Sequence, residues 1–305
     1  MIIRVLGSAA GGGFPQWNCG CRNCAGVRNG RVRATPRTQE SITLSANGAD
    51  WFIVNASPEI RTQIEAFAGL HPKAVRHTPI AGIFLTNGDL DHCLGLLSLR
   101  ESQPITIYAT QKMWRGFCED NRVYRTLERF QGQVRWQRLR LDETLPLATQ
   151  TGVPSGLNVC AMPVPGKLPI HLEGATPGAE DNVCLRFTEE RSGQSFVYMP
   201  AIAGPHSELA EQVKGATCLF LDGTFWSDDE LIEQGLGTKR AADMAHWPLG
   251  GPEGSLEWLK KLPPMRRVLI HINNTNPLLR EDSPERKAVE AAGVQIAYDG
   301  MEFSP

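Results

Sequence analysis

The stretch Ile83–Gly95, IFLTNGDLDHCLG, decides the fold. Its apolar start predicts a buried strand, and the spacing that resumes after the turn predicts a helix over residues 92–101. Oxygen ligands beside an imidazole suit a divalent metal. An Asx-rich turn that caps a helix would explain the NGD run, but it leaves the added Asp-His pair unexplained. The polar side chains of this turn are those of Asn87, Asp89, Asp91 and His92.

The strand, the turn and Asp91-His92 followed by Leu94-Gly95 resemble the metal-binding turn of the metallo-β-lactamase superfamily. The usual pattern there is His-x-His-x-Asp-His, and this chain has Asn87 and Asp89 in place of the first two histidines. The resemblance implies an α/β fold of the αββα type, in which two sheets pack together between helices. It also implies that one of the two usual metal positions is weakened or lost.

Longer runs across nearly the whole chain resemble the PqqB family of pyrroloquinoline quinone (PQQ) biosynthesis. That family resemblance implies a small peptide-derived precursor in which glutamate and tyrosine are cross-linked, and oxidation of the tyrosine-derived ring. The runs that carry it are VLGSAAGGGFPQWNCGCRNC (Val5–Cys24), NASPEIR (Asn55–Arg61), GLLSLRE (Gly95–Glu101), LDGTFWSDDE (Leu221–Glu230) and LIHINNTNP (Leu269–Pro277).

Length and composition indicate an ordinary globular protein. The chain has 305 residues, which we interpret as a single domain over 1–305, with 41% hydrophobic and 21% charged residues. A net charge of −2 gives no basic footprint for nucleic acid. No apolar run approaches the ~20 residues that a membrane span needs, and no signal peptide precedes the first strand, so we expect a cytoplasmic protein without membrane insertion.

Three cysteines in the segment at about 17–26 form a CxCxxC motif, with thiols at Cys19, Cys21 and Cys24. Thiolates at this spacing can surround one zinc ion, whereas exposed free thiols would be exposed to oxidation. The family resemblance implies a structural zinc. In some relatives the residue three positions beyond the C-terminal metal histidine is its fourth ligand, and here that residue is Asn274, whose amide binds zinc weakly. The other five cysteines are scattered and indicate no disulfide framework.

His271 follows an apolar strand, as the central turn does. Alone it would be interpreted as structural, but the resemblance implies that it is a metal ligand. With Asp91 and His92 it completes two imidazoles and one carboxylate, the set that leaves open positions on Fe(II) for dioxygen and substrate. Mn, Fe and Zn all accept these ligands, and loss of the second metal favours iron chemistry. We expect Asp89 to be a fourth ligand or a base, and Asn87 to orient its neighbours.

Several other polar residues have more than one interpretation. Asp222 is either a neighbour of the ligands or a helix-start acid, and His246 either faces the substrate or is a satisfied loop histidine. Superfamily members commonly place a bridging aspartate near Ala201, which offers no carboxylate. The glycine-rich segment 7–17 lacks a phosphate-loop pattern, and we expect it to line the site. The proline- and glycine-rich segment 163–181 predicts a functional loop, with His171 a loop residue rather than a ligand.

Three functions are compatible with these residues. The first is an iron-dependent, oxygen-dependent hydroxylase that acts on the tyrosine-derived ring. The second is a carrier or transport-associated protein for PQQ or its precursor, and the third is a metal-dependent hydrolase. We also expect a homodimer whose symmetric contact is braced by the zinc loop.

Overall fold

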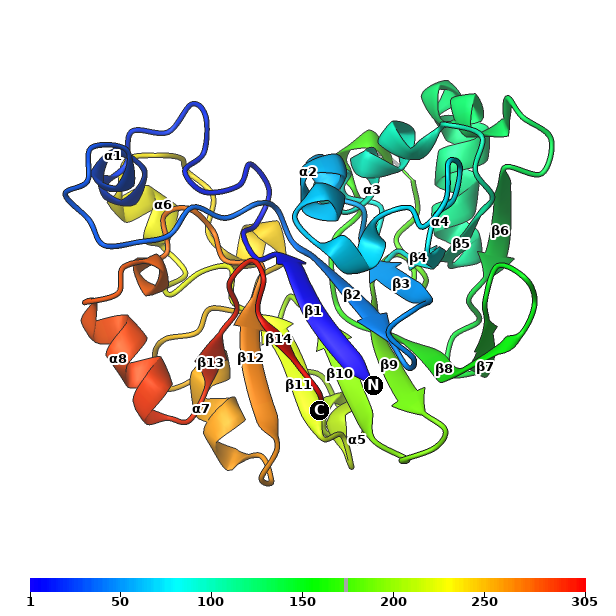
Figure 1. The fold of residues 1–305 in the computed structure, drawn as a ribbon. Coiled ribbons are helices and arrows are strands. Elements are labelled where there is room, and N and C mark those ends of the chain that lie inside the picture. The colour runs from blue at the N-terminus through cyan, green and yellow to red at the C-terminus, as the bar shows by residue number, and fades with distance from the viewer. Residues whose placement is uncertain (173–174) are drawn as a thin grey trace.

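The computed structural model spans residues 1–305 and describes all of them except 173–174. Two seven-stranded sheets pack face to face, and helices cover their outer faces (Figure 1). The αββα sandwich predicted from the sequence is confirmed.

Both sheets combine antiparallel strands with a run of parallel ones. In the first sheet the spatial order is β14 (Glu302–Phe303), β1 (Ile2–Gly7), β2 (Ser41–Ser45), β3 (Trp51–Val54), β4 (Ile80–Phe84), β5 (Ile105–Ala109) and β6 (Val134–Arg138). In the second it is β13 (Gln295–Ile296), β12 (Arg266–Ile270), β11 (Cys218–Asp222), β10 (Ser195–Met199), β9 (Val183–Glu189), β8 (Pro154–Pro163) and β7 (Thr144–Ala148). The last strand, β14, returns to the first sheet beside β1, so the two ends of the chain lie close together (Figure 1).

Buried side chains on the two faces of the second sheet belong to two separate cores. On β10, Phe196 and Tyr198 point into the core between the sheets, whereas Val197 and Met199 belong to the core under the helices. Successive side chains of a strand point to opposite faces, which gives this split. Phe84 of β4 meets Phe187 of β9 edge to face, with ring centroids 5.1 Å apart, and so joins the two sheets.

Short helices cover the outer faces. Leu209, Leu256 and Val289 belong to the core of buried side chains outside the second sheet, where three of the helices pack. The α-helices are α1 (Arg22–Arg28), α2 (Ile60–Glu65), α3 (Leu90–Cys93), α4 (Gln111–Arg115), α5 (Leu209–Val213), α6 (Glu230–Glu233), α7 (Ser255–Lys261) and α8 (Pro284–Ala291). In the described ranges 1–172 and 175–305, no helix has the length and apolar composition that crossing a membrane requires.

The direction of the parallel strands places the polar turns at one edge of the sandwich. In the first sheet β3, β4 and β5 run parallel, and in the second β10, β11 and β12 do. Parallel strands end at the same edge of a sheet. The turn after β4 therefore meets the residues that follow β11 and β12.

The segment after the metal-binding turn is less regular than the sequence predicts. Instead of one helix over 92–101, α3 ends at Cys93 and a 3₁₀ segment follows at Leu94–Leu99. The reason is tertiary: the carbonyl of His92 accepts the Ala56 N–H at 2.7 Å, and the Gly95 N–H is donated to the Ala56 carbonyl at 2.9 Å. Both backbone groups are thereby engaged outside the helix.

Gly95 is the tightest point of this contact, and we predict that Gly95→Ala destabilises the protein. A Cβ at Gly95 would lie 2.1 Å from the Ser57 carbonyl oxygen, a backbone atom that cannot rotate away. We expect a loss of about 1–3 kcal/mol in the free energy of unfolding, measured by urea titration. Gly237→Ala, with no atom near its added Cβ, is the control and should change little. Equal stability of the two variants would contradict this packing.

Candidate metal centre

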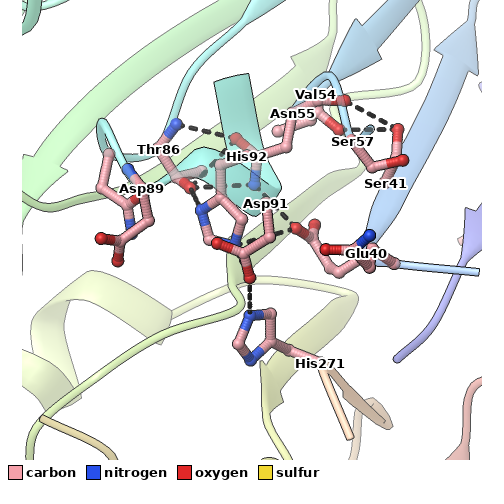
Figure 2. Close-up of polar contacts among 12 residues, drawn as sticks. Glu40, Ser41, Val54, Asn55, Ser57, Thr86, Asp89, Asp91, His92 and His271 are labelled. Atoms are coloured by element: carbon pink, nitrogen blue, oxygen red, sulfur yellow. Dashed lines mark hydrogen bonds and ion pairs between the residues drawn. The ribbon is translucent and has the colours of Figure 1, made fainter. Parts of the chain in front are cut away.

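Asp91, His92 and His271 bring their ligand atoms within 4.8 Å of one another. The Asp91 Oδ2 atom lies 3.1 Å from His271 Nε2 and 3.8 Å from His92 Nε2. Figure 2 shows the three side chains converging from the turn after β4 and the end of β12. The structure therefore assembles the predicted ligand set, with both Nε2 atoms directed at one carboxylate oxygen.

The orientation of His271 is fixed from behind by a hydroxyl. Thr224 Oγ1 lies 2.5 Å from Asp222 Oδ1 and 2.8 Å from His271 Nδ1. The hydroxyl has one proton, and its other neighbours, the Asp222 carboxylate and the His271 carbonyl at 2.8 Å, can only accept, so the proton goes to one of these oxygens and not to the ring. Thr224 then accepts from the Nδ1–H of His271, so the neutral ring carries its proton on Nδ1 and offers Nε2, the nitrogen that faces Asp91 at 3.1 Å. This tautomer is the one that a metal ligand needs.

His92 is held in the same way. Its Nδ1 lies 3.3 Å from the hydroxyl of Thr86, which also accepts from the Asn55 amide at 3.0 Å. His92 Nε2 is buried and has no hydrogen-bond partner among the described residues. A buried polar atom without a partner is costly, so a metal ion at this atom would satisfy it. The donor set thus fits a divalent metal held by two imidazoles and one carboxylate.

Glu40 is a neighbour of this centre that the sequence analysis missed. It is fully buried, with Oε2 3.3 Å from His92 Nε2 and 2.9 Å from the donating Asn55 Nδ2 (Figure 2). Burial raises the pKa of Glu40 to about 8. Its only sequence signal is an acid directly before a strand, which also describes many exposed acids. Its position behind His92 depends on how β2 packs beside β3.

Charges at the centre are strongly coupled. Burial opposes ionisation of Asp91, but His92 and His271 outweigh it and hold the pKa of this carboxyl well below its usual range. Burial also opposes the charge of His271, but the hydrogen bond and charge of Asp91 raise the pKa of His271 to about 9. For His92 burial prevails and lowers the pKa to about 4. A metal ion must therefore displace a proton from His271, so its affinity falls as pH is lowered.

Asp222, His246 and His271 form a second group with ligand atoms within 4.8 Å. Asp222 already accepts four hydrogen bonds, two of them from Thr224 at 2.5 and 2.9 Å, one from the Ile202 N–H at 3.1 Å and one from His246 Nδ1 at 2.7 Å. Its oxygens are saturated, which indicates an orienting anion rather than a second metal ligand. His246 stacks on His271, with centroids 5.4 Å apart. His246 is therefore a hydrogen-bonded loop histidine that also lines the cleft, and its facing a substrate stays a prediction.

A cleft of about 380 Å³ opens above the centre. The glycine-rich segment lines it through Ala10 and Gly11, as expected, and Ala201 lies there without a carboxylate. Lys167 and His171, from the segment 163–181 predicted as a functional loop, line it as well. The remaining lining residues, which no sequence pattern indicated, are Leu90, Thr224, Phe225, Met244 and Asn273.

Two predicted residues of the turn lie outside the ligand group. Asp89 lines the cleft, but its carboxylate lies apart from the three ligands (Figure 2) and does not join any group of converging ligand atoms among the described residues. Burial raises the pKa of Asp89, and the negative charge of Asp91 adds to this. Asn87 is buried, and its Oδ1 accepts the Asp89 N–H at 3.0 Å. Asn87 therefore shapes the turn.

The three cysteines of the CxCxxC motif converge at the start of α1. The side-chain amide of Asn274 lies over all of them, with Nδ2 3.2 Å from Cys19 Sγ, 3.7 Å from Cys21 Sγ and 3.3 Å from Cys24 Sγ. A half-turn of an amide exchanges its nitrogen and oxygen. The structure therefore brings Asn274 to the fourth position, where its oxygen would face a zinc ion. Asn23 anchors the same segment by donating to the Asn274 carbonyl at 3.0 Å.

Comparison with known proteins gives consistent matches. Residues 50–272 match the model of the β-lactamase superfamily domain. Coenzyme PQQ synthesis protein B of Stutzerimonas stutzeri is 43% identical, with 99% of each chain covered, and that of Azotobacter vinelandii is 44% identical at the same coverage. The crystal structure of Zn(2+)-bound PqqB from Methylobacterium extorquens covers 100% of both chains at a TM-score of 0.92 and 42% identity.

We predict that His92→Ala and His271→Ala each release the active-site metal while the fold survives, because both ligands lie where a strand gives way to a loop. Metal affinity should fall by more than about 100-fold, the upper range for loss of an outer partner. Metal content after dialysis, with circular dichroism of the same samples, measures this. His71→Ala, outside the cleft, is the control. Wild-type metal content in both variants would show that the ligands are assigned wrongly.

We predict that replacing Cys19, Cys21 and Cys24 by serine removes one zinc per chain. Stability should fall by about 2.7 kcal/mol when free zinc is about 100 times its dissociation constant, because metal binding to the folded state is folding energy. Cys118→Ser, a scattered thiol, is the control. The homodimer also stays a prediction. If the zinc loop braces the dimer contact, the cysteine variant should sediment as a monomer, and an unchanged sedimentation profile would show that the dimer does not depend on the zinc loop.

Proposed function

The chain belongs to the PqqB family of the metallo-β-lactamase superfamily, and from this membership we infer that it acts in coenzyme PQQ synthesis. We propose that it is an oxygen-dependent hydroxylase of the tyrosine-derived ring in a cross-linked Glu-Tyr precursor. In this proposal Asp91, His92 and His271 hold Fe(II).

One observation carries the proposal. Two imidazole Nε2 atoms and one carboxylate oxygen converge beneath an open cleft, and two histidines with one carboxylate are the ligand set typical of non-haem Fe(II) oxygenases. A two-metal hydrolase needs more ligands, yet Ala201 offers none and Asn87 is engaged within its own turn. The saturated hydrogen bonding of Asp222 further disfavours a second ion. When bound, Fe(II) would activate dioxygen for transfer of one oxygen atom to the ring.

The side chains of the cleft would place the ring and handle its proton. Leu90, Phe225 and Met244 supply apolar surface near the ligands, which suits an aromatic ring. Asp89 lies on the same cleft with a raised pKa, so its carboxylate is placed to take a phenolic proton. His246, held by Asp222 through Nδ1, lines the cleft as a second polar side chain.

We predict that protein reconstituted anaerobically with Fe(II) consumes dioxygen and adds oxygen mass to a tyrosine-containing precursor when exposed to air. The second oxygen atom leaves as water, so the assay contains ascorbate as the two-electron reductant. An oxygen electrode measures the consumption of dioxygen, and mass spectrometry measures the oxygen mass added to the precursor. The Zn(II) form is the control and should be inactive, because zinc has no redox chemistry.

Other results would select another function. Equal turnover with Zn(II), or product formed without oxygen, would exclude the hydroxylase and favour a hydrolase. Tight binding of the precursor by the Fe(II) form without oxygen consumption would favour a carrier.

A further inference from the structure

The segment after β8 forms one wall of the cleft and is fixed against the metal-binding turn. A Cβ added at Gly88 would lie 3.1 Å from Cγ of Pro169, so this wall packs directly on the turn. The carbonyl of Lys167 accepts the Asn182 amide at 2.8 Å. Gly166 leaves room for that amide, since a Cβ there would lie 2.3 Å from it. The backbone that carries Lys167 is therefore positioned by packing.

Lys167 is the only lysine or arginine among the described residues that line the cleft. Its ammonium forms no ion pair with a carboxylate in the described part of the chain. By contrast, Lys112, which lies nearby on α4, is paired with Asp181 at 2.5 Å. The charge of Lys167 acts on the Asp89 carboxylate of the same cleft, where it works against the rise in the pKa of Asp89. Because the two groups form no ion pair, the ammonium stays available to an anionic group of a ligand.

His171 lies on the same wall and has no hydrogen-bond partner in the part of the chain that the structure describes. Both of its ring nitrogens are buried and unpaired, although its ring packs near Phe117 with centroids 6.2 Å apart. Buried polar atoms are nearly always hydrogen-bonded, so the ring lacks a partner, and because His171 lines the cleft a bound ligand would supply one when the ring turns toward it. Burial lowers the pKa of His171, which keeps the ring neutral with one donor and one acceptor. The sequence interpretation of His171 as a mere loop residue is therefore incomplete.

We propose that Lys167 and His171 form a carboxylate subsite that binds the amino-acid carboxylate of an aromatic substrate. The apolar residues Leu90, Phe225 and Met244 line the same cleft, so the ring would lie on that surface over the ligand group. Anchoring the carboxylate fixes which end of the substrate faces the metal. The inference takes its substrate class from the proposed function, but it concerns binding alone.

The test uses Zn(II)-loaded protein, which binds without turnover, and two probes that differ only at the carboxyl group. L-tyrosine carries a carboxylate, and L-tyrosinamide carries a neutral amide. Isothermal titration should show tyrosine binding about tenfold more tightly than the amide to wild-type protein, since a charge-assisted hydrogen bond is about twice as strong as a neutral one. Lys167→Met should abolish this preference, whereas Lys167→Arg should keep most of it.

His171→Phe keeps an aromatic ring but removes both nitrogens, and it should weaken tyrosine binding a few-fold. Lys73→Met removes the same charge from an exposed lysine outside the cleft and should leave both affinities unchanged. Thermal melting of each variant checks that it is folded. Equal affinity of the wild type for the two probes, no binding of tyrosine, or a preference that survives Lys167→Met would overturn the subsite. Because zinc is redox-inactive, these binding results do not depend on the outcome of the hydroxylase assay, which uses the Fe(II) form.

Discussion

The contact between Asp91 Oδ2 and His271 Nε2, 3.1 Å long, joins residues 180 positions apart and depends on nearly everything else in the fold. It requires β4 in one sheet and β12 in the other to end at the same edge, so the sheets must pack in one relative position. The alternation of buried side chains along both strands fixes their faces. Aromatic contacts such as that of Phe84 with Phe187 hold the sheets in place behind the site.

This arrangement costs stability, and the cost is concentrated at the centre. Asp91 and Asp222 are acids whose pKa stays low, and taking such charges largely out of water is unfavourable unless each is paired and hydrogen-bonded. Glu40 is fully buried beside them, and its raised pKa reflects the same cost. His271 and Asn55 also have φ near 60°, a conformation that a side chain disfavours by about 1–3 kcal/mol. The surrounding hydrogen bonds keep both residues in place. A bound metal ion would offset part of the cost of burial, because it would pair with the Asp91 charge and with the unpaired Nε2 of His92.

The cysteine loop and the metal centre are structurally coupled through the segment after β12. His271 contacts Asp91, and Asn274 in the same segment covers the three thiols. The glycine-rich segment that precedes the cysteines also reaches the centre, since a Cβ at Gly11 would lie 3.2 Å from Asp91 Oδ2. Ordering of the cysteine loop therefore helps to order both the wall of the cleft and the end of the strand that delivers His271.

The sequence by itself determined the fold class and the cysteine cluster, and it pointed to Asp91, His92 and His271 as a candidate ligand set. The cysteines and the Asp-His pair are recognised by local spacing, whereas the fold class and His271 come from family motifs that recur along the chain. It did not determine the helix after the turn, which the tertiary contact of Gly95 with Ala56 breaks. Nor did it identify Glu40, Lys167 or the approach of Asp222 and His246 to His271. These side chains come from distant segments and carry no periodic signal. Only the packing of the two sheets brings them to one edge and decides which polar groups are paired there.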